Sequence, residues 1–206
     1  MIARRQPKPS GHLRSGLLLV FAVLPAVAQA CLGGDNHETP VFQCEASNGK
    51  KYIELCFNDG YDAGYATAPN EASYLVYRFG ALDEHQDAGT IELEYPARNE
   101  DSFKKFFAAR YSSGKWYTQS IRFVSGNFDY TVFTHWRGAT EEEAADEFSV
   151  AKDEGVEEDG VEIRNRTTGK RSYVWCSERP RFYIQELKDL VACDKQTPAG
   201  AAACIE

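Results

Sequence analysis

Apolar and polar residues alternate most regularly between Trp116 and Trp136. The dipeptide Gly126-Asn127 divides this stretch and is a two-residue turn signal of β-hairpins. Side chains of a strand alternate between its two faces, so residues that lie opposite each other across the hairpin share a face. The turn therefore predicts an apolar face formed by the pairs Ser125–Phe128, Phe123–Tyr130, Ile121–Val132 and Tyr117–Trp136. The other face is predicted to be mostly polar, with Ser120, Arg122, Asp129 and Thr131, and with Val124 and Phe133 as its apolar exceptions.

The segment Val41–Cys56 predicts a second hairpin, which turns at Asn48-Gly49. This turn sets Cys44 opposite Ile53 on an apolar face, next to the pair Phe42–Leu55. The opposite face is predicted to hold Val41 and Cys56. Because Cys44 and Cys56 point away from each other, they are not expected to bond together.

The segment Val161–Cys176 predicts a third hairpin, with its turn at Thr168-Gly169. This turn sets Val161 opposite Cys176 and Ile163 opposite Val174, again on one apolar face. Since Cys44 and Cys176 both lie on the core side of their hairpins, we expect them to bond across the core.

The remaining periodic segments complete the predicted fold. Two strands and three short helices are expected: strands at Tyr74–Phe79 and Ile91–Tyr95, and helices at Ser102–Tyr111, Glu141–Glu147 and Arg181–Cys193. The fold class predicted is mainly β, an antiparallel sheet arranged as a sandwich or a partly open barrel. One or two short helices pack on it, and disulfides stabilise it.

The first thirty residues have the pattern of an export signal. Four basic residues precede the apolar core Gly16–Val27, and Ala28-Gln29-Ala30 fits a cleavage site. The alternative is a lipoprotein signal with Cys31 as the lipidated residue. The pattern predicts a signal peptide at 1–30, a single exported β-rich domain at 31–206, and a periplasmic or secreted location. No integral membrane segment is expected after cleavage.

The six cysteines all follow this signal. An even number of cysteines behind an export signal indicates disulfides, and close pairs such as C-x-x-C, which bind metals, are missing. Cys193–Cys204 is a plausible link for the small-residue tail, and Cys31–Cys56 is then left by elimination. Six cysteines allow fifteen pairings, so this map, together with Cys44–Cys176, is one of many.

Charge limits the classes of partner. The signal contains four bases and no acids, so the chain from residue 31 has 19 basic and 31 acidic residues, a formal charge of −12. This disfavours a nucleic-acid partner and permits a basic protein. The residues 141–162 hold eleven acids and one base. Three interpretations of this acidic segment are open: a calcium site, a docking face for a basic protein and a solvated surface. The spacing of the acids does not match an EF-hand loop, which argues against the calcium site.

Catalytic motifs are missing from the sequence. His135 lies near the end of a strand, and no G-x-S-x-G or other nucleophile motif accompanies it. No catalytic residue, metal or cofactor is therefore predicted. Tyr173 and Trp175, on the face away from Val174, and Trp116 are outward aromatics, which often anchor a partner or stack on sugars.

Several short segments carry a resemblance. Residues 41–56 contain C-x-x-x-N-G-K, residues 77–80 read YRFG, and residues 126–132 read G-x-x-x-Y-T-V. They resemble small exported proteobacterial (periplasmic) proteins that are uncharacterised, which implies location and fold. More loosely, the chain is similar to periplasmic lysozyme inhibitors. Ser113-Gly114-Lys115 and Ser125-Gly126-Asn127 are similar to the Ser-Gly loops that those inhibitors insert into an enzyme cleft.

These observations predict a non-enzymatic periplasmic or secreted binding protein. Its most concrete version is an inhibitor or immunity protein against a basic cell-wall lytic enzyme. The alternatives are a secreted hydrolase whose carboxylates converge only in the fold, a calcium-dependent module and a structural envelope protein. The candidate binding residues are Ser113, Gly114, Lys115, Ser125, Gly126, Asn127 and Trp175.

Overall fold

The fold was analysed in a computed structural model that describes residues 31–34, 37–58, 72–85, 87–97, 101–114, 116–138, 155–187, 189–197 and 204. The segment expected to be a signal peptide, the predicted helix Glu141–Glu147 and Lys115 lie outside these residues. The strands are β1 (Glu38–Ala46), β2 (Lys51–Asn58), β3 (Tyr74–Leu82), β4 (Ala88–Tyr95), β5 (Phe106–Ser113), β6 (Trp116–Ser125), β7 (Phe128–Arg137), β8 (Val156–Asn165), β9 (Arg171–Trp175), β10 (Arg181–Phe182) and β11 (Ala192–Cys193). Two 3₁₀ helices accompany them, η1 (Ser102–Lys105) and η2 (Ile184–Leu187).

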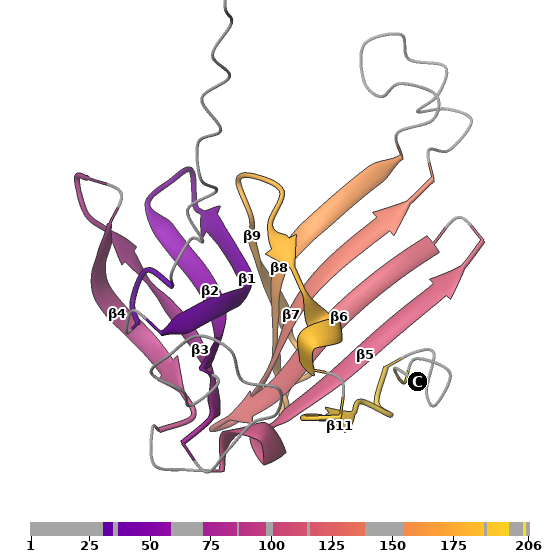
Figure 1. Ribbon diagram of the computed structural model, residues 1–206. Coiled ribbons are helices and arrows are strands. Elements are labelled where there is room, and N and C mark those ends of the chain that lie inside the picture. The colour runs from indigo at the N-terminus through magenta and orange to yellow at the C-terminus, as the bar shows by residue number, and fades with distance from the viewer. Residues whose placement is uncertain are drawn as a thin grey trace, which may run out of the picture.

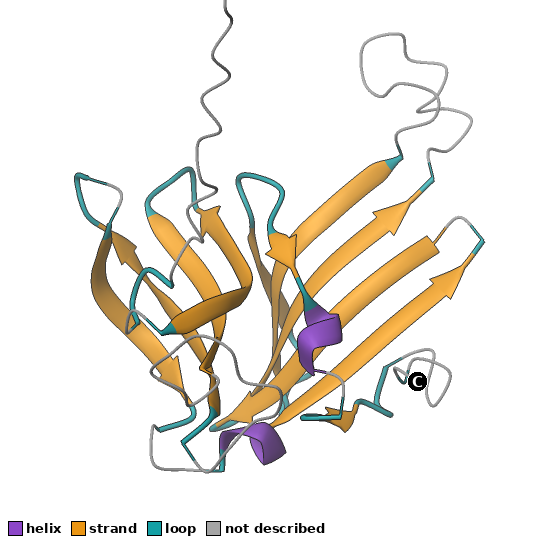
Figure 2. Ribbon diagram, viewed as in Figure 1, coloured by secondary structure: helices purple, strands orange, loops and turns teal. Residues whose placement is uncertain are grey.

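Two sheets face each other and splay apart, as Figure 1 shows. The five-stranded sheet has the order β10-β1-β2-β3-β4, and the six-stranded sheet has the order β11-β5-β6-β7-β8-β9. All neighbours are antiparallel except the short pair β11–β5, which is parallel. Strands dominate the described residues and the two helices are single turns (Figure 2). The predicted β-rich, disulfide-stabilised fold class is therefore confirmed.

The hairpin β6–β7 has the register that its turn predicts. Ser125 pairs with Phe128, Phe123 with Tyr130 and Ile121 with Val132. Ile121, Phe123 and Val132 are buried in the core between the sheets. The face predicted to be buried is therefore the inner face of the six-stranded sheet.

The hairpin β1–β2 also has its predicted pairs, Phe42 with Leu55 and Cys44 with Ile53. The prediction for Val41 is wrong, because the register shifts between Pro40 and Phe42. Val41 is the extra residue of this bulge and belongs to the main core.

The third hairpin has a different register from the predicted one. Val161 pairs with Val174 and Ile163 with Ser172, two residues away from the predicted partners. The side-chain oxygen of Asn165 accepts hydrogen bonds from the N–H groups of Thr167 (3.0 Å) and Thr168 (2.9 Å), so that a longer loop replaces the expected tight turn. A slip of two residues preserves the faces, because the side-chain period of a strand is two.

Two predicted helices are wrong. Only Ser102–Lys105 forms a helical turn, and the chain continues as β5, because Phe106 enters the core while Phe107 packs on the opposite face under Arg122. The segment Arg181–Cys193 contains two short strands and η2 instead of one helix. Its predicted inward residues are nevertheless right: Ile184 and Leu187 are fully buried and Val191 packs against the core.

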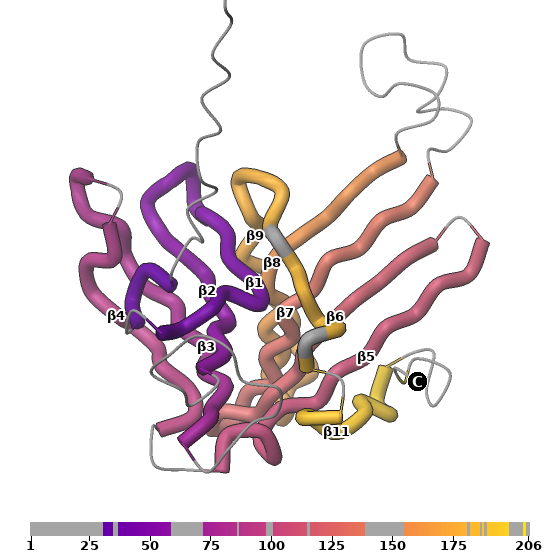
Figure 3. The backbone as a smooth tube through the Cα atoms, in the orientation of Figure 1, coloured from indigo at the N-terminus to yellow at the C-terminus, as the bar shows by residue number. Residues whose placement is uncertain are grey.

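Aromatic rings fill the space between the sheets. Phe123 lies at the centre, stacked on Tyr95 (ring centroids 4.7 Å apart) and on Tyr130 (4.9 Å), with Tyr77 tilted against it (4.8 Å). Figure 3 shows the chain after β9 passing in front of the six-stranded sheet, and η2 contacts β6 there.

All three predicted disulfides are present: Cys31–Cys56, Cys44–Cys176 and Cys193–Cys204. Cys44–Cys176 joins the two sheets, and Cys176 also forms a β-bridge with Ala46. Three disulfides are compatible with a non-cytoplasmic protein. Among the described residues, no helix is long and apolar enough to cross a membrane.

Candidate functional site

The side of the six-stranded sheet that points away from the five-stranded sheet carries the candidate site, and we call it the outer face. Its side chains alternate along β5–β9 with the core residues and form rows across the strands. One row is Arg122, Thr131, Glu162 and Tyr173, and the next is Ser120, Phe133, Gly160 and Trp175. Apart from Gly160, the residues of these rows line a depression of about 410 Å³, together with residues of the C-terminal segment such as Asp194 and Thr197.

One wall of the depression is aromatic. The rings of Tyr173 and Trp175 stack with an interplanar angle of 9° and centroids 5.1 Å apart, although Tyr173 is 42% and Trp175 47% exposed. Phe133 meets both rings edge-on, at 6.5 Å from Tyr173 and 5.8 Å from Trp175. The two exposed rings are therefore held in one arrangement before any ligand arrives.

Gly160 makes the close contact between Phe133 and Trp175 possible. It lies between them in the same row, and it has no side chain to separate their rings. A Cβ atom at this position would overlap the carbonyl oxygen of Val174 in the neighbouring strand. Only glycine fits this close approach of β8 and β9.

The opposite wall is a buried ion pair. Arg122 donates to both carboxylate oxygens of Asp194, at 2.8 Å and 3.1 Å, and its guanidinium lies 4.7 Å from the ring centroid of Phe107. Its Nη1 is also 3.7 Å from Asp129. On the aromatic side, Glu162 accepts a hydrogen bond from the Tyr173 hydroxyl (2.9 Å), and Arg171 lies 3.5 Å from it. The charges of the depression are thus largely paired with one another.

His135 lies at the end of the depression. Its Nδ1 is hydrogen-bonded to the Thr118 hydroxyl at 2.7 Å, and the ring of Trp116 lies 5.3 Å from it, centroid to centroid. Both contacts hold the imidazole against the sheet.

The candidate binding residues from the sequence are spread over the molecule. Ser113 and Gly114 lie at the β5–β6 end, whereas Ser125, Gly126 and Asn127 lie at the other end of β6, a strand of ten residues or about 30 Å. The two turns therefore do not form one loop cluster. Trp175 is the candidate that lines the depression.

The turn at Asn127 is tied to the neighbouring hairpin. The Asn127 amide donates to the Thr167 hydroxyl at 2.9 Å, and the backbone N–H of Arg166 donates to the Asn127 carbonyl at 3.0 Å. These bonds brace the β6–β7 turn against the β8–β9 loop, which gives Asn127 a structural role.

A second depression of about 410 Å³ lies around the start of β8 and the end of β9, lined by Glu157, Asp159, Trp175, Cys176 and Arg179 among others. Asp159 is buried and accepts a hydrogen bond from the Thr134 hydroxyl. Burial raises the pKa of Asp159 to about 6, and the charge of Glu157 adds to the rise. The Thr134 hydrogen bond and Arg179 oppose it.

Asp159→Asn is expected to raise the melting temperature, relative to the natural chain, by more above pH 6 than at pH 4.5. The carboxyl pKa rises from 3.8 to about 6 on folding, so the folded state favours the protonated form. Below about pH 4 both states are protonated, the free-energy cost of ionising the buried carboxyl grows between about pH 4 and 6, and above about pH 6 it is constant. Melting temperatures of both proteins between pH 4.5 and 7.5 test this. Glu158→Gln, which removes an exposed charge from the same strand, is the control, and a pH-independent Asp159→Asn difference would contradict the assignment.

A buried charge network occupies the outer side of the five-stranded sheet. Arg78 is fully buried and binds Glu38 through both terminal nitrogens (2.5 Å and 2.8 Å), Glu94 through Nε (2.8 Å) and Glu54 through Nη1 (3.3 Å). Burial lowers the pKa of Arg78, but the bonds and charges of these carboxylates outweigh it and the pKa rises. Burial raises the pKa of Glu54, against the hydrogen bonds from Gly33, Leu32 and Arg78.

The N-terminal segment Leu32–Gly34 covers this network. The N–H groups of Leu32 and Gly33 donate to the Glu54 carboxylate at 2.8 Å and 3.0 Å. A Cβ on Gly34 would overlap the Glu38 carboxylate, so a larger residue there would displace that side chain from its place beside Arg78.

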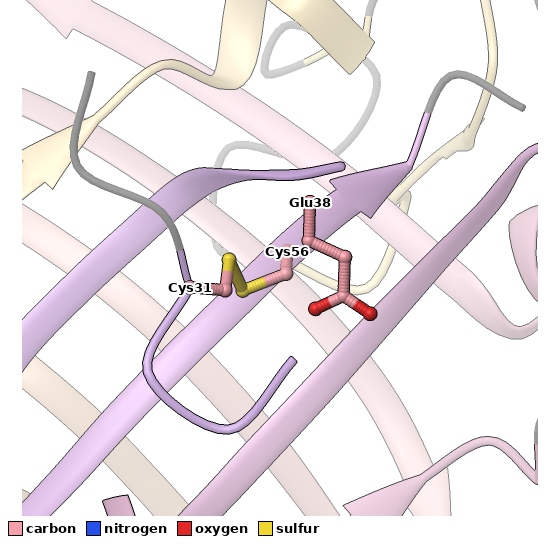
Figure 4. A group of neighbouring side chains, drawn as sticks. All are labelled: Cys31, Glu38 and Cys56. Atoms are coloured by element: carbon pink, nitrogen blue, oxygen red, sulfur yellow. A yellow bond between two sulfur atoms is a disulfide. The ribbon is translucent and has the colours of Figure 1, made fainter. Parts of the chain in front are cut away.

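The Cys31–Cys56 disulfide fixes the same segment, next to Glu38 (Figure 4). The two sulfurs and a carboxylate oxygen lie within 4.8 Å of one another. Sulfurs joined in a disulfide cannot be thiolate ligands, and the Glu38 carboxylate points away from them toward Arg78 and Tyr74, so this group does not fit a metal. The disulfide also occupies the sulfur that the lipoprotein alternative requires.

Sequence reasoning missed the carboxylate that completes the ion pair of the outer face. Asp194, the partner of Arg122, lies 72 residues away along the chain. The signal that could have found it is the predicted Cys193–Cys204 link, because Asp194 directly follows Cys193. Comparison of the chain with protein-family models, with curated proteins and with solved structures finds no match.

Proposed function

We propose that the protein is a non-enzymatic binding protein of the periplasm or the cell exterior, and that its binding surface is the outer face. The observation that carries the proposal is the exposed, pre-stacked pair Tyr173–Trp175 beside a depression of about 410 Å³. Exposed Trp, Tyr and Arg side chains dominate the energy of binding surfaces. A sheet face that served only stability has no need for such rings in solvent.

The paired charges support binding rather than catalysis on this face. Asp194 and Glu162 each accept hydrogen bonds from other side chains, and Asp129 lies near Arg122. A general base must be free to take a proton from a substrate. These carboxylates instead hold the arginines and the tyrosine in place.

A basic cell-wall lytic enzyme is the concrete protein partner for this function. The formal charge of −12 from residue 31 onward would speed and steer the approach of such an enzyme. The Ser113-Gly114 turn, at the exposed tip of β5–β6 beside the exposed Trp116, is the part of the loop pattern that this version would use.

The second candidate function is a hydrolase, and Asp159 favours it. Its pKa of about 6 is suited to a general acid, and Glu157 lines the same depression. Cell-wall glycan incubated with the protein, with Asp159→Asn as the comparison, tests for turnover. Release of soluble fragments by the natural chain alone would replace the binding proposal.

Trp175→Ala is expected to weaken capture of the envelope component by about 30-fold, equivalent to about 2 kcal/mol for an aromatic anchor. Immobilised protein is incubated with envelope extract, and the bound material is quantified by mass spectrometry. A separate assay measures whether the protein inhibits lysozyme. Tyr183→Ala is the matched control, because Tyr183 is 48% exposed, as Trp175 is 47%, and lies in another part of the fold. Equal capture by all three proteins would overturn the assignment of the outer face.

A further inference from the structure

We propose that the ligand of the outer face is an uncharged saccharide segment. This inference rests on the proposed function, in which the outer face is the binding surface, and it names the chemical class that the surface takes. Four properties of the depression lead to it: its size, its aromatic wall, its charge balance and its hydroxyl-bearing side chains.

The size of the depression suits one or two sugar rings. Its volume of about 410 Å³ falls in the range of small-ligand sites, roughly 300–1,000 Å³. It lies on an open sheet face, so a chain can enter and leave at its ends while one segment occupies it. A polymer of small repeating units fits this shape.

The aromatic wall matches the apolar face of a sugar ring. A pyranose presents C–H groups on its ring faces and hydroxyl groups around its edge. An exposed aromatic ring can therefore cover a ring face while polar side chains bind the hydroxyl groups. Tyr173 and Trp175 keep almost half of their surface exposed. Because Phe133 and their mutual stacking hold them, little side-chain freedom remains to be lost on binding.

The charge balance argues for a neutral ligand. Three arginines (Arg122, Arg164 and Arg171) share the depression with four carboxylates (Asp129, Glu158, Glu162 and Asp194). Phosphate ligands are bound by an excess of cations, and basic peptides are bound by an excess of anions. Inside the depression the carboxylates outnumber the arginines by only one, although the chain as a whole is acidic. Ion pairs such as Arg122–Asp194 offer donors and acceptors side by side, and a hydroxyl group can use both.

Hydroxyl groups complete the lining. Thr118, Ser120 and Thr131 form part of the floor between the two walls. The hydroxyl oxygen of Thr197 is buried, lines the depression and has no hydrogen-bond partner within the described part of the chain. A buried hydroxyl without a partner is unfavourable, and a ligand hydroxyl would satisfy it.

Calorimetric titration of the full mature chain with tri-N-acetylglucosamine and with maltotriose tests the proposal. The first probe represents N-acetylated wall glycan and the second a plain hexose polymer, so the tighter of the two identifies the source. Saturable binding of at least one is expected. Trp175→Ala should weaken it at least about tenfold, and Thr197→Val, which keeps the shape but removes the hydroxyl, by about 2- to 10-fold. Tyr183→Ala should bind as the natural chain does.

The outcomes separate this inference from the function on which it rests. If neither saccharide binds but Trp175→Ala abolishes capture of an envelope protein, the saccharide assignment is wrong and the outer face remains a binding surface for protein. Saccharide binding that Trp175→Ala leaves unchanged also overturns the inference. If Trp175→Ala changes neither saccharide binding nor capture from extract, both proposals fail.

Discussion

Replacing Cys44 and Cys176 together by alanine is expected to lower the free energy of unfolding by about 5 kcal/mol. The bond closes a loop of 132 residues, and a crosslink stabilises mainly by removing conformations of the unfolded chain, more for a longer loop. It also holds the two sheets together beside the Ala46–Cys176 bridge. Urea denaturation followed by circular dichroism measures the loss. Such a change approaches the whole stability of an ordinary domain.

The other two disulfides provide graded controls for this prediction. The same chain-entropy relation gives about 3.5 kcal/mol for Cys31–Cys56, which spans 25 residues, and about 3 kcal/mol for Cys193–Cys204, which spans 11. The three alanine double variants should therefore lose stability in the order of their loop lengths. Equal losses, or the largest loss for the C-terminal pair, would contradict a role set by loop length.

Arg78→Met is expected to destabilise the fold by about 3–5 kcal/mol. The substitution keeps an apolar stem of similar length but leaves the buried carboxylates of Glu38 and Glu54 without their cation. Breaking a buried network by removing one partner is far more harmful than replacing all of it. Equilibrium unfolding in urea at pH 7 gives the magnitude.

Two further measurements distinguish lost charge pairing from lost packing. Adding Glu38→Gln and Glu54→Gln to Arg78→Met should recover much of the loss, since no buried charge then remains unpaired. Burial already raises the pKa of Glu54 beside Arg78, and without the arginine it rises further. The folded Arg78→Met protein therefore favours the protonated carboxyl, so its stability should increase relative to the natural chain as the pH falls from 7 toward 5.

A surface pair supplies the matched comparison for Arg78. Lys51 and Glu92 form a partly exposed ion pair in the same sheet. Lys51→Met should change stability by no more than about 1 kcal/mol, because solvent screens exposed pairs. If Arg78→Met and Lys51→Met behave alike, the network contributes no more than a surface contact.

Turn dipeptides made much of the fold predictable. Gly126-Asn127 and Asn48-Gly49 each fixed a register, and with it the residues that face the core. At the third hairpin the carboxamide of Asn165 lengthened the loop and changed the partners, yet the faces survived because the slip was even. The Cys44–Cys176 bond followed from the same faces, since both cysteines were predicted to point inward.

The failed helices show the limit of spacing rules. Phe103, Phe106 and Phe107 recur as they would on a helix, but Phe106 and Ala108 also alternate with Phe107 as they would on a strand. Pairing of Phe106 with Phe123 in β6 decided between the two patterns. A short apolar segment adopts the structure that its partner strand allows, and the partner is not visible from local sequence.

The candidate site was predictable in composition but not in assembly. The polar face with Arg122, Asp129 and Thr131 and the outward Trp175 were expected, and the structure places them around one depression. Its second wall depends on Asp194, which reaches Arg122 only after the tail folds back along β5. Long-range pairing of this kind leaves no periodic trace.

Two of the resemblance segments, residues 41–56 and 77–80, contribute to the fold and not to the outer face. Cys44 forms the bond between the sheets, and Asn48-Gly49 forms the β1–β2 turn. The arginine of YRFG is Arg78, the centre of the buried network, and its glycine is Gly80, which lies against the Tyr52 ring. Each of these residues has a structural task away from the outer face.

The path of the chain through both sheets also sets an order of events during synthesis. A ribosome delivers Cys31, Cys44 and Cys56 early, while the partner of Cys44 follows 132 residues later. The strand that completes the first sheet beside β1 is β10, which is delivered later still. The five-stranded sheet therefore lacks its edge strand β10, and Cys44 lacks its disulfide partner, until nearly the entire polypeptide has emerged.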